Sequence, residues 1–295
     1  MHDMSTEFRT HIESGLTTLC RAWAITRKDG ASFGFTDHDR PLSFEDITFK
    51  ADSGLTALAL QQSTGLSVDN SEAVGALSDA SVTEEDIEAG RFDGADVKAW
   101  LVNWSDPDVR WLQFRGTIGE VRRADGAFHA ELRGLTEALN RPLGRVYQKP
   151  CTAVLGDGQC RFDLDTPGYA HIAPVEDIDD TRVFRWTELP GFEPGWFGRG
   201  RLTVVTGAAE GLWGSVKWDR LIEGVRQIEL WEPIRGQIQA GDEVRLEAGC
   251  DKRLETCRLK FNNILNFQGF PDVPGEDWMV AYPRSSGTNS GGSRR

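Results

Sequence analysis

Four of the five cysteines in this sequence are grouped in two short segments that lie far apart along the chain. The first pair is Cys151 and Cys160, and the second pair is Cys250 and Cys257. Two cysteine pairs of this kind are typical of a site where four thiolates hold one metal centre. Because such a site requires the two segments to meet, it constrains the fold more than any other feature of the sequence.

The second pair straddles the start of a predicted helix. Residues 252–266 carry apolar side chains at helical spacing. If Cys250 and Cys257 both lay on that helix, they would stand ~10.5 Å apart, which is too far for a disulfide and for one small cluster. We therefore expect Cys250 in the loop before the helix, where Gly249 lets the backbone fold back, and Cys257 on its first turns.

The spacing leaves several cysteine chemistries open. The intervals within the two pairs hold eight and six residues, which is wider than the C-x-x-C knuckle of zinc fingers. This favours an iron–sulfur cluster, whose sulfur ligands can be spread further. A zinc ion, two disulfides and four buried thiols remain alternatives, and a reducing cytoplasm favours metal binding over disulfides. The fifth cysteine, Cys20, lies in an apolar helical pattern and is interpreted as a small buried hydrophobe.

The bulk properties predict a globular protein made in the cytoplasm. There is no run of ~18 apolar residues, so no membrane span is expected, and the N-terminus has no apolar signal segment. The net charge is −13, which argues against a nucleic-acid-binding surface.

The hydrophobic patterns predict a mainly β protein with a few short helices, an α+β chain. Hairpin turns are expected at 28–30 and at Asp125-Gly126. A helix is expected within 5–21, and Thr83-Glu84-Glu85-Asp86 is a capping signature for a second one. Residues 97–104 are apolar on both faces, as in a central strand.

The predicted organisation has two β-rich lobes. The N-terminal domain is expected at 1–148, the C-terminal domain with the metal site at 149–284, and a disordered tail rich in Ser, Gly and Asn at 285–295. The four cysteines are expected to join the lobe junction to the C-terminal helix.

No catalytic motif is recognisable in the sequence. A Gly-x-Ser-x-Gly elbow and the Gly-Lys-Ser/Thr of a phosphate loop are both absent. Asp37-His38-Asp39 is interpreted as a polar turn before Pro41, and nothing local in the sequence supports a pairing of Cys20 with any histidine as a nucleophile. The chain is therefore predicted not to be an enzyme.

Several segments, taken together, resemble tail proteins of long-tailed phages and of gene transfer agents, which are phage-derived particles. They span roughly residues 5–280 and comprise Ala89–Ala95, Val102–Trp104, Gly116–Val121, Glu131–Leu135, Tyr147–Cys151, Gly249–Cys257 and Pro271–Gly275. The family that the sequence resembles is that of the baseplate hub proteins, related to the iron–sulfur minor tail tip proteins of lambdoid phages.

The resemblance implies a structural role in a virion tail baseplate, assembled in the bacterial cytoplasm. It implies a homotrimer of barrel-like lobes, the first like a tail-tube domain, placed between the distal tail protein ring and the central tail-tip or fibre protein. A tail peptidase and a tape measure protein are further candidate neighbours. DNA would pass through the channel without specific binding, and an acidic wall would suit that passage.

The resemblance also implies a [4Fe–4S] cluster held by Cys151, Cys160, Cys250 and Cys257, with zinc as the alternative metal. Two other functions stay open on the residues alone. One is a cysteine-dependent hydrolase or a redox enzyme of the tail tip, which requires a reactive thiol of low pKa. The other is a zinc-stabilised adaptor of the same architecture.

Overall fold

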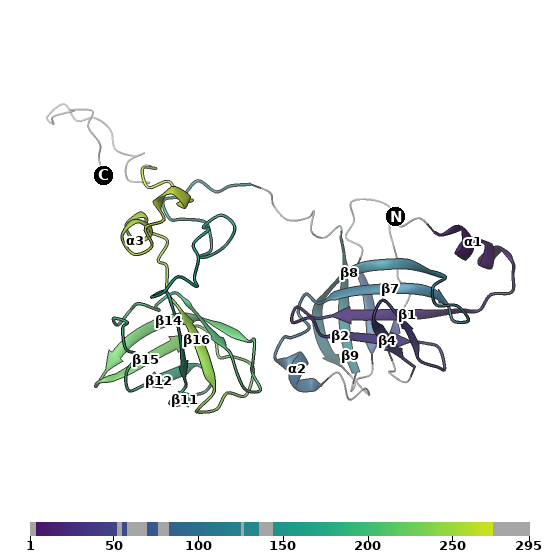
Figure 1. The fold of residues 1–295 in the computed structure, drawn as a ribbon, viewed down its shortest axis with the longest axis horizontal. Coiled ribbons are helices and arrows are strands. Elements are labelled where there is room, and N and C mark those ends of the chain that lie inside the picture. Colours follow the sequence, from purple (N-terminus) through teal and green to yellow (C-terminus); the bar gives the residue numbers. More distant parts are fainter. Residues whose placement is uncertain are drawn as a thin grey trace. The chain divides into compact units, whose positions relative to one another are not determined.

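The computed structural model describes residues 4–51, 55–57, 70–75, 83–124, 127–135 and 144–273. The chain divides into two compact units, Met1–Pro142 and Leu143–Arg295, and each contains its own β-sheet (Figure 1). The sequence places the boundary slightly later, after residue 148. The tail predicted at 285–295 lies outside the described residues.

Among its described residues, the first unit contains two short α-helices, α1 (Thr6–Glu13) and α2 (Glu84–Glu88), and a nine-stranded sheet. The strands follow the order β3-β4-β2-β1-β7-β8-β9-β6-β5 across the sheet. Their bounds are β1 (Leu19–Thr26), β2 (Ser32–Thr36), β3 (Leu42–Phe44), β4 (Ile47–Lys50), β5 (Leu55–Ala57), β6 (Asn70–Gly75), β7 (Asp96–Asn103), β8 (Arg110–Ala124) and β9 (Ala127–Gly134).

Both predicted hairpins are present. β1 and β2 pair in antiparallel fashion up to Thr26 and Ser32, and Gly30 adopts a φ of 89° in the turn, which a glycine tolerates without strain. β8 and β9 pair up to Ala124 and Ala127, while the turn residues between them lie outside the described part of the chain.

The helix expected within 5–21 is shorter than the sequence indicates. α1 ends at Glu13, Gly15 takes a φ of 70°, and β1 has begun by Leu19. Cys20 is therefore a strand residue, because β1 pairs with β2 on one side and β7 on the other. Its burial is confirmed, and its Sγ donates to the carbonyl oxygen of Val102 at 3.7 Å.

The capped helix and the central strand form as predicted. The Thr83 hydroxyl accepts a hydrogen bond from the Asp86 backbone N–H at 3.2 Å, which satisfies a free donor at the start of α2. β7 lies between β1 and β8. Its Val97 and Ala99 join one apolar cluster while Trp100 and Val102 join another, so both faces of the strand are buried.

The second unit is built on a seven-stranded sheet of order β10-β16-β13-β14-β15-β12-β11. β10 and β11 lie in the acidic stretch 163–182, which shows little periodicity in the sequence. The strand bounds are β10 (Ala170–Pro174), β11 (Asp177–Asp179), β12 (Val183–Trp186), β13 (Arg201–Val204), β14 (Trp213–Ile222), β15 (Val225–Leu230) and β16 (Glu243–Glu247).

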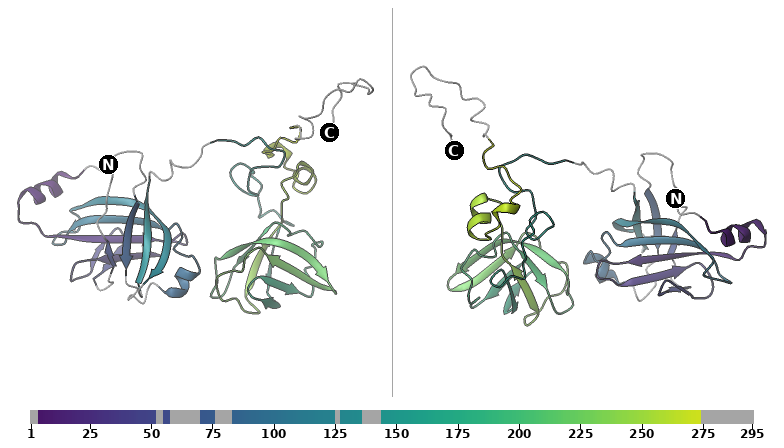
Figure 2. Two further views of the ribbon diagram at one scale, coloured as in Figure 1. Left: turned by 180° about the vertical axis from the view of Figure 1, so that it is seen from behind. Right: turned by 45° about the horizontal axis from the view of Figure 1, so that its top comes forward.

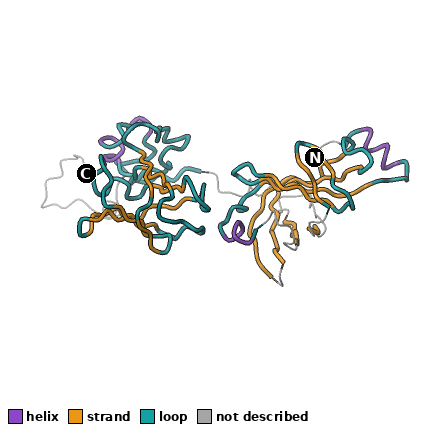
Figure 3. The backbone as a smooth tube through the Cα atoms, turned by 60° about the horizontal axis from the view of Figure 1, so that its bottom comes forward, coloured by secondary structure: helices purple, strands orange, loops and turns teal. Residues whose placement is uncertain are grey.

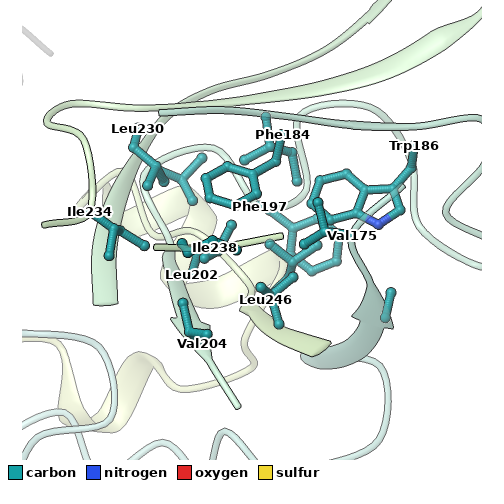
Figure 4. Packing of buried hydrophobic residues seen from close by; sticks show 14 of the residues in the cluster. Val175, Phe184, Trp186, Phe197, Leu202, Val204, Leu230, Ile234, Ile238 and Leu246 are labelled. Atoms are coloured by element: carbon teal, nitrogen blue, oxygen red, sulfur yellow. The ribbon is translucent and has the colours of Figure 1, made fainter. Parts of the chain in front are cut away.

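One continuous apolar core packs against this sheet (Figure 4). Phe184, Leu202, Ile228, Leu230 and Leu246 are all fully buried in it. Burying each such side chain contributes about 1.5–3 kcal/mol. The sheet of the second unit is therefore held together mainly by hydrophobic packing.

The predicted fold class is confirmed in part. The chain is mainly β with a few short helices, but the described strands do not close into barrels. The strand order ends at β3 and β5 in the first sheet and at β10 and β11 in the second. All four paired cysteines belong to the second unit, so they do not join the two lobes. No helix in the described part of the chain is long and apolar enough to cross a membrane.

Candidate metal centre

The four paired cysteines lie in a loop-rich extension of the second sheet, which we call the cysteine module and define as residues 144–168 and 249–273. Figures 1 and 2 show its helix, α3 (Leu254–Leu259), beside the loop that precedes β10, at one end of the sheet. Figure 3 shows that this region consists mainly of loops.

The helix predicted over 252–266 is interrupted. α3 ends at Leu259, Asn262 has a φ of 46°, and a single 3₁₀ turn, η2 (Ile264–Asn266), follows. A positive φ cannot continue a right-handed helix. The positions of the cysteines are nonetheless as expected, with Cys250 in the loop before α3 and Cys257 on the helix.

Hydrogen bonds join the two segments of the module directly. The Cys151 backbone N–H donates to the Lys252 carbonyl at 2.8 Å, and the Phe270 N–H donates to the Gln148 carbonyl at 2.9 Å. The Lys252 ammonium donates to the Ala153 carbonyl. These contacts bring the second cysteine pair against the first.

All four cysteines line one pocket, together with apolar side chains that include Leu155, Phe261 and Phe267. Each of the four is partly buried, and none forms a disulfide. The structure therefore brings together every cysteine that the sequence singled out for the site.

Two of the cysteine sulfurs accept hydrogen bonds from N–H groups. The Gln268 backbone donates to Cys151 Sγ at 3.4 Å, and the Asn263 side-chain amide donates to Cys160 Sγ at 3.5 Å. Such donors stabilise the thiolate form of a cysteine and orient it as a metal ligand.

The pKa values of Cys250 and Cys257 argue against a nucleophilic role for these two thiols. Burial raises the pKa of Cys257 to about 11, with further upward contributions from the other three cysteines. Burial also raises the pKa of Cys250. A catalytic cysteine requires the opposite shift, because the thiolate is the reactive species.

The four cysteines share a pocket, but no group of three or more His, Cys, Asp or Glu side chains within the described ranges is arranged to hold a metal ion. Thiolates bound to one zinc converge to ~2.3 Å from it. In a [4Fe–4S] cluster each thiolate binds a different iron atom, so the four sulfurs surround a larger body.

A partly buried lysine contacts the segment before strand β13 and the residues of the module that follow β16. Lys260 Nζ donates to the carbonyls of Trp196 and Gly249 at 2.7 and 3.0 Å and lies 4.2 Å from the centre of the Trp196 ring. Burial lowers its pKa. Its own carbonyl accepts from the Tyr169 hydroxyl at 2.6 Å.

Sequence reasoning missed the roles of both Lys260 and Asn263. The only available signal was the Asn262-Asn263 pair after the helix, because asparagine favours turns and positive φ. Nothing in the sequence indicated that either side chain would meet segments that lie far away along the chain.

Comparison with known proteins defines the class of this chain. A model of the baseplate hub protein family, describing its N-terminal attachment domain, matches residues 5–163, which is more than half of the sequence. The chain therefore belongs to the baseplate hub protein family. A second family model, described as phage conserved hypothetical protein BR0599, matches residues 195–277.

A solved structure of a gene transfer agent, described as "Virion of native gene transfer agent (GTA) particle", contains a similar chain. The two chains share 57% identity, and the match covers 98% of this chain and 99% of the other with a TM-score of 0.91. A comparison with curated proteins found no match. The resemblance and the baseplate assignment are thus confirmed, and so is the prediction of a structural protein rather than an enzyme.

Proposed function

We propose that this protein is the structural hub of the baseplate in a particle of the gene-transfer-agent type. Three copies form the hub, which links the distal tail ring to the central tip protein and surrounds the DNA channel. The family match and the similarity over nearly the full length of a gene transfer agent virion chain support this role.

We further propose that Cys151, Cys160, Cys250 and Cys257 hold a [4Fe–4S] cluster. The observation that carries this proposal is that all four line one pocket and that two of them accept N–H hydrogen bonds. When bound, the cluster supplies four iron–thiolate bonds, which cross-link the two segments of the cysteine module.

The module needs such a cross-link because it has almost no apolar core. Within its two described segments, Ala153 and Phe261 are the only buried hydrophobic residues. α3 contains no buried residue and has no side-chain cap, and a helix of six residues is not stable alone in water. Metal–ligand bonds can provide the missing folding free energy.

The outer face of β14 and β15 supports a role in assembly. Trp213 is 59% exposed and Trp231, just after β15, is 61% exposed. Arg201 and Lys217 lie 6.0 and 5.7 Å from the centres of these two rings. Exposed tryptophan beside a cationic side chain is typical of binding hot spots. We propose that this tryptophan face contacts a neighbouring baseplate protein.

Charge supports passage of DNA without specific binding. The net charge of −13 arises mostly within the first unit, since acidic residues outnumber basic ones most strongly before residue 143. An acidic wall repels DNA and keeps it from adhering.

The first test concerns the cofactor. The full chain would be purified without oxygen, and its visible spectrum, iron, sulfide and zinc would be measured on one sample. About four irons and four sulfides per chain are expected for a [4Fe–4S] centre. Colourless protein with one zinc ion per chain would show that the cofactor is zinc and not an iron–sulfur cluster. Metal-free protein with freely reacting thiols would show that the four cysteines form no metal site.

The second test concerns assembly. Light scattering on the purified chain should give the mass of a trimer. A monomer under all conditions would refute the proposed trimer.

In producing cells, Trp213→Gln combined with Trp231→Gln should lower incorporation of the hub into particles without unfolding it. Ile172→Gln, at another exposed apolar position of the same unit, is the control. Normal incorporation of the double variant would show that the tryptophan face is not an interface.

A further inference from the structure

Asn263 touches both cysteine pairs of the module. Its backbone N–H donates to the Cys257 carbonyl at 3.0 Å, and its carbonyl accepts from the Cys257 thiol at 3.3 Å. Its side-chain Nδ2 donates to the Cys160 carbonyl at 2.7 Å and lies 3.5 Å from Cys160 Sγ. Cys160 is 103 positions away in the sequence, so one residue bridges the two segments at the wall of the pocket.

The orientation of this amide is set by a second asparagine. Asn266 Nδ2 donates to Asn263 Oδ1 at 2.7 Å, so the oxygen of Asn263 faces Asn266 and its nitrogen faces Cys160. An amide is the side-chain group that can accept from one neighbour and donate to the other in this way. An aspartate of the same shape would offer Cys160 only an acceptor oxygen.

We propose that Asn263 is a positioning residue of the cysteine site, which holds Cys160 in place and stabilises its thiolate through an N–H···S hydrogen bond. This inference rests on the proposed [4Fe–4S] centre. Groups around the ligands of a metal orient them and set their basicity, and hydrogen bonds to the sulfurs help to set the reduction potential of a cluster.

The role of Asn263 differs from that of the other N–H donor at the site. Cys151 receives its hydrogen bond from a backbone N–H group, that of Gln268. A side-chain substitution leaves such a donor in place. Asn263 uses a side chain for Cys160, so a single substitution removes this donor and leaves the four cysteines intact.

The chain offers a matched pair of variants for the test. Asn263→Asp exchanges the donor for a carboxylate, and Asn262→Asp makes the same chemical change one position away. Asn262 is exposed and has a φ of 46°, a conformation that aspartate also tolerates. Both variants add the same charge, so a difference between them reports the hydrogen bond. Asn263→Ala removes the donor without adding charge.

The variants would be purified as full chains without oxygen. We expect Asn263→Asp and Asn263→Ala to lose iron to a chelator about 10–100-fold faster than wild type, the scale typical of outer-shell substitutions. The retained cluster should have a lower reduction potential in both, because the thiolate has lost a hydrogen bond. Asn262→Asp should match wild type in chelation rate. Far-ultraviolet circular dichroism would check that the sheet of each variant is folded.

The possible outcomes distinguish the role of Asn263 from the [4Fe–4S] proposal on which it rests. If wild type holds iron and sulfide but both Asn263 variants match Asn262→Asp in chelation rate and potential, the role of Asn263 is refuted and the cluster proposal stands. If wild type holds neither iron nor sulfide, the cluster proposal fails and this inference fails with it.

Discussion

The two parts of the second unit are stabilised in opposite ways. The seven-stranded sheet encloses one apolar core that includes Phe184, Trp186 and Leu230. The cysteine module, attached at one end of the same sheet, buries only Ala153 and Phe261 among the hydrophobic side chains of its described segments. Leu265 at its surface is 97% exposed. Hydrophobic burial can explain the stability of the sheet but not that of the module.

What replaces a core in the module is a set of specific polar contacts around four cysteines. Lys260 and Asn263 donate to the carbonyls of Trp196 and Cys160, which lie on other segments, at 2.7 Å each. A hydrogen bond contributes only about 0.5–1.5 kcal/mol net, which is small against the entropy of ordering two long loops. We therefore expect the folding of the module to depend on its proposed metal, and the folding of the sheet to be independent of it.

Removing one proposed ligand should have the largest effect and should separate the regions most sharply. Cys257→Ala is expected to abolish the cluster and loosen the module, while the sheet stays folded because its core is intact. Loss of visible absorbance and of iron, with faster proteolysis confined to the module, would be measured on protein purified without oxygen.

Cys20→Ala is the control for this prediction, because Cys20 is buried in the first unit and does not line the pocket. It should keep full iron content. Unchanged absorbance in Cys257→Ala would contradict the ligand assignment. Loss of the sheet together with the module would contradict the independence of the two regions.

The buried ion pair of Asp219 and Arg226 tests the sheet. The two side chains are 0% and 5% exposed, and Arg226 also donates to the carbonyls of Phe192 and Glu193. Arg226→Met leaves a buried carboxylate unpaired, which costs about 3–5 kcal/mol. Urea denaturation should show this loss.

The exposed ion pair of Asp177 and Arg185 provides the comparison. Asp177→Asn should change the free energy of unfolding by no more than about 1 kcal/mol. Equal effects of the two substitutions would show that the buried network does not matter to the sheet.

A smaller effect is expected from trimming a side chain in each region. Ile228→Val in the sheet core should lower the free energy of unfolding by about 0.5–1.5 kcal/mol. Leu265→Ala in the module should stay within about 0.5 kcal/mol, because its side chain packs on almost nothing. A larger loss of unfolding free energy in Leu265→Ala would mean that Leu265 contacts an apolar surface of another chain. Denaturation of the purified protein at several concentrations would reveal such a contact.

The sequence predicted the cysteine set more fully than the fold around it. Cysteines are rare enough that their pairing is visible without any structure, and the helix cap at Thr83 and the hairpin at Gly30 depend on local chemistry. The members of each cysteine pair, the cap and the hairpin are encoded within a few residues. The structure contains the cap and the hairpin and brings the two cysteine pairs to one pocket, while the role of the cysteines as ligands stays a prediction.

The features that were missed depend on contacts between distant segments. Cys20 lies in a helical pattern, yet pairing with β2 and β7 makes it a strand residue. The strands β10 and β11 were hidden because their stretch is acidic and irregular in pattern, although β10 pairs with β16. The prediction of barrel-like lobes came from the resemblance. The observed strand order shows open sheets instead, and strand order cannot be predicted from local periodicity.

The smallest expected effect is a pH dependence of the sheet that the module should not share. His171 lies on β10 opposite Leu246, and its ring centre is 5.2 Å from that of Phe192. Burial lowers the pKa of His171, so the folded state favours the neutral ring. As pH falls below ~6.5, the unfolded chain binds the proton first and the sheet loses stability. This loss is complete once the pH is below the folded-state pKa.

Melting temperatures would be measured between about pH 7.5 and 5, a range that brackets the ordinary histidine pKa. As the pH falls, the melting temperature should decrease less in His171→Gln than in wild type. Both proteins should have equal iron content at neutral pH. Parallel curves would show that His171 does not couple protons to folding.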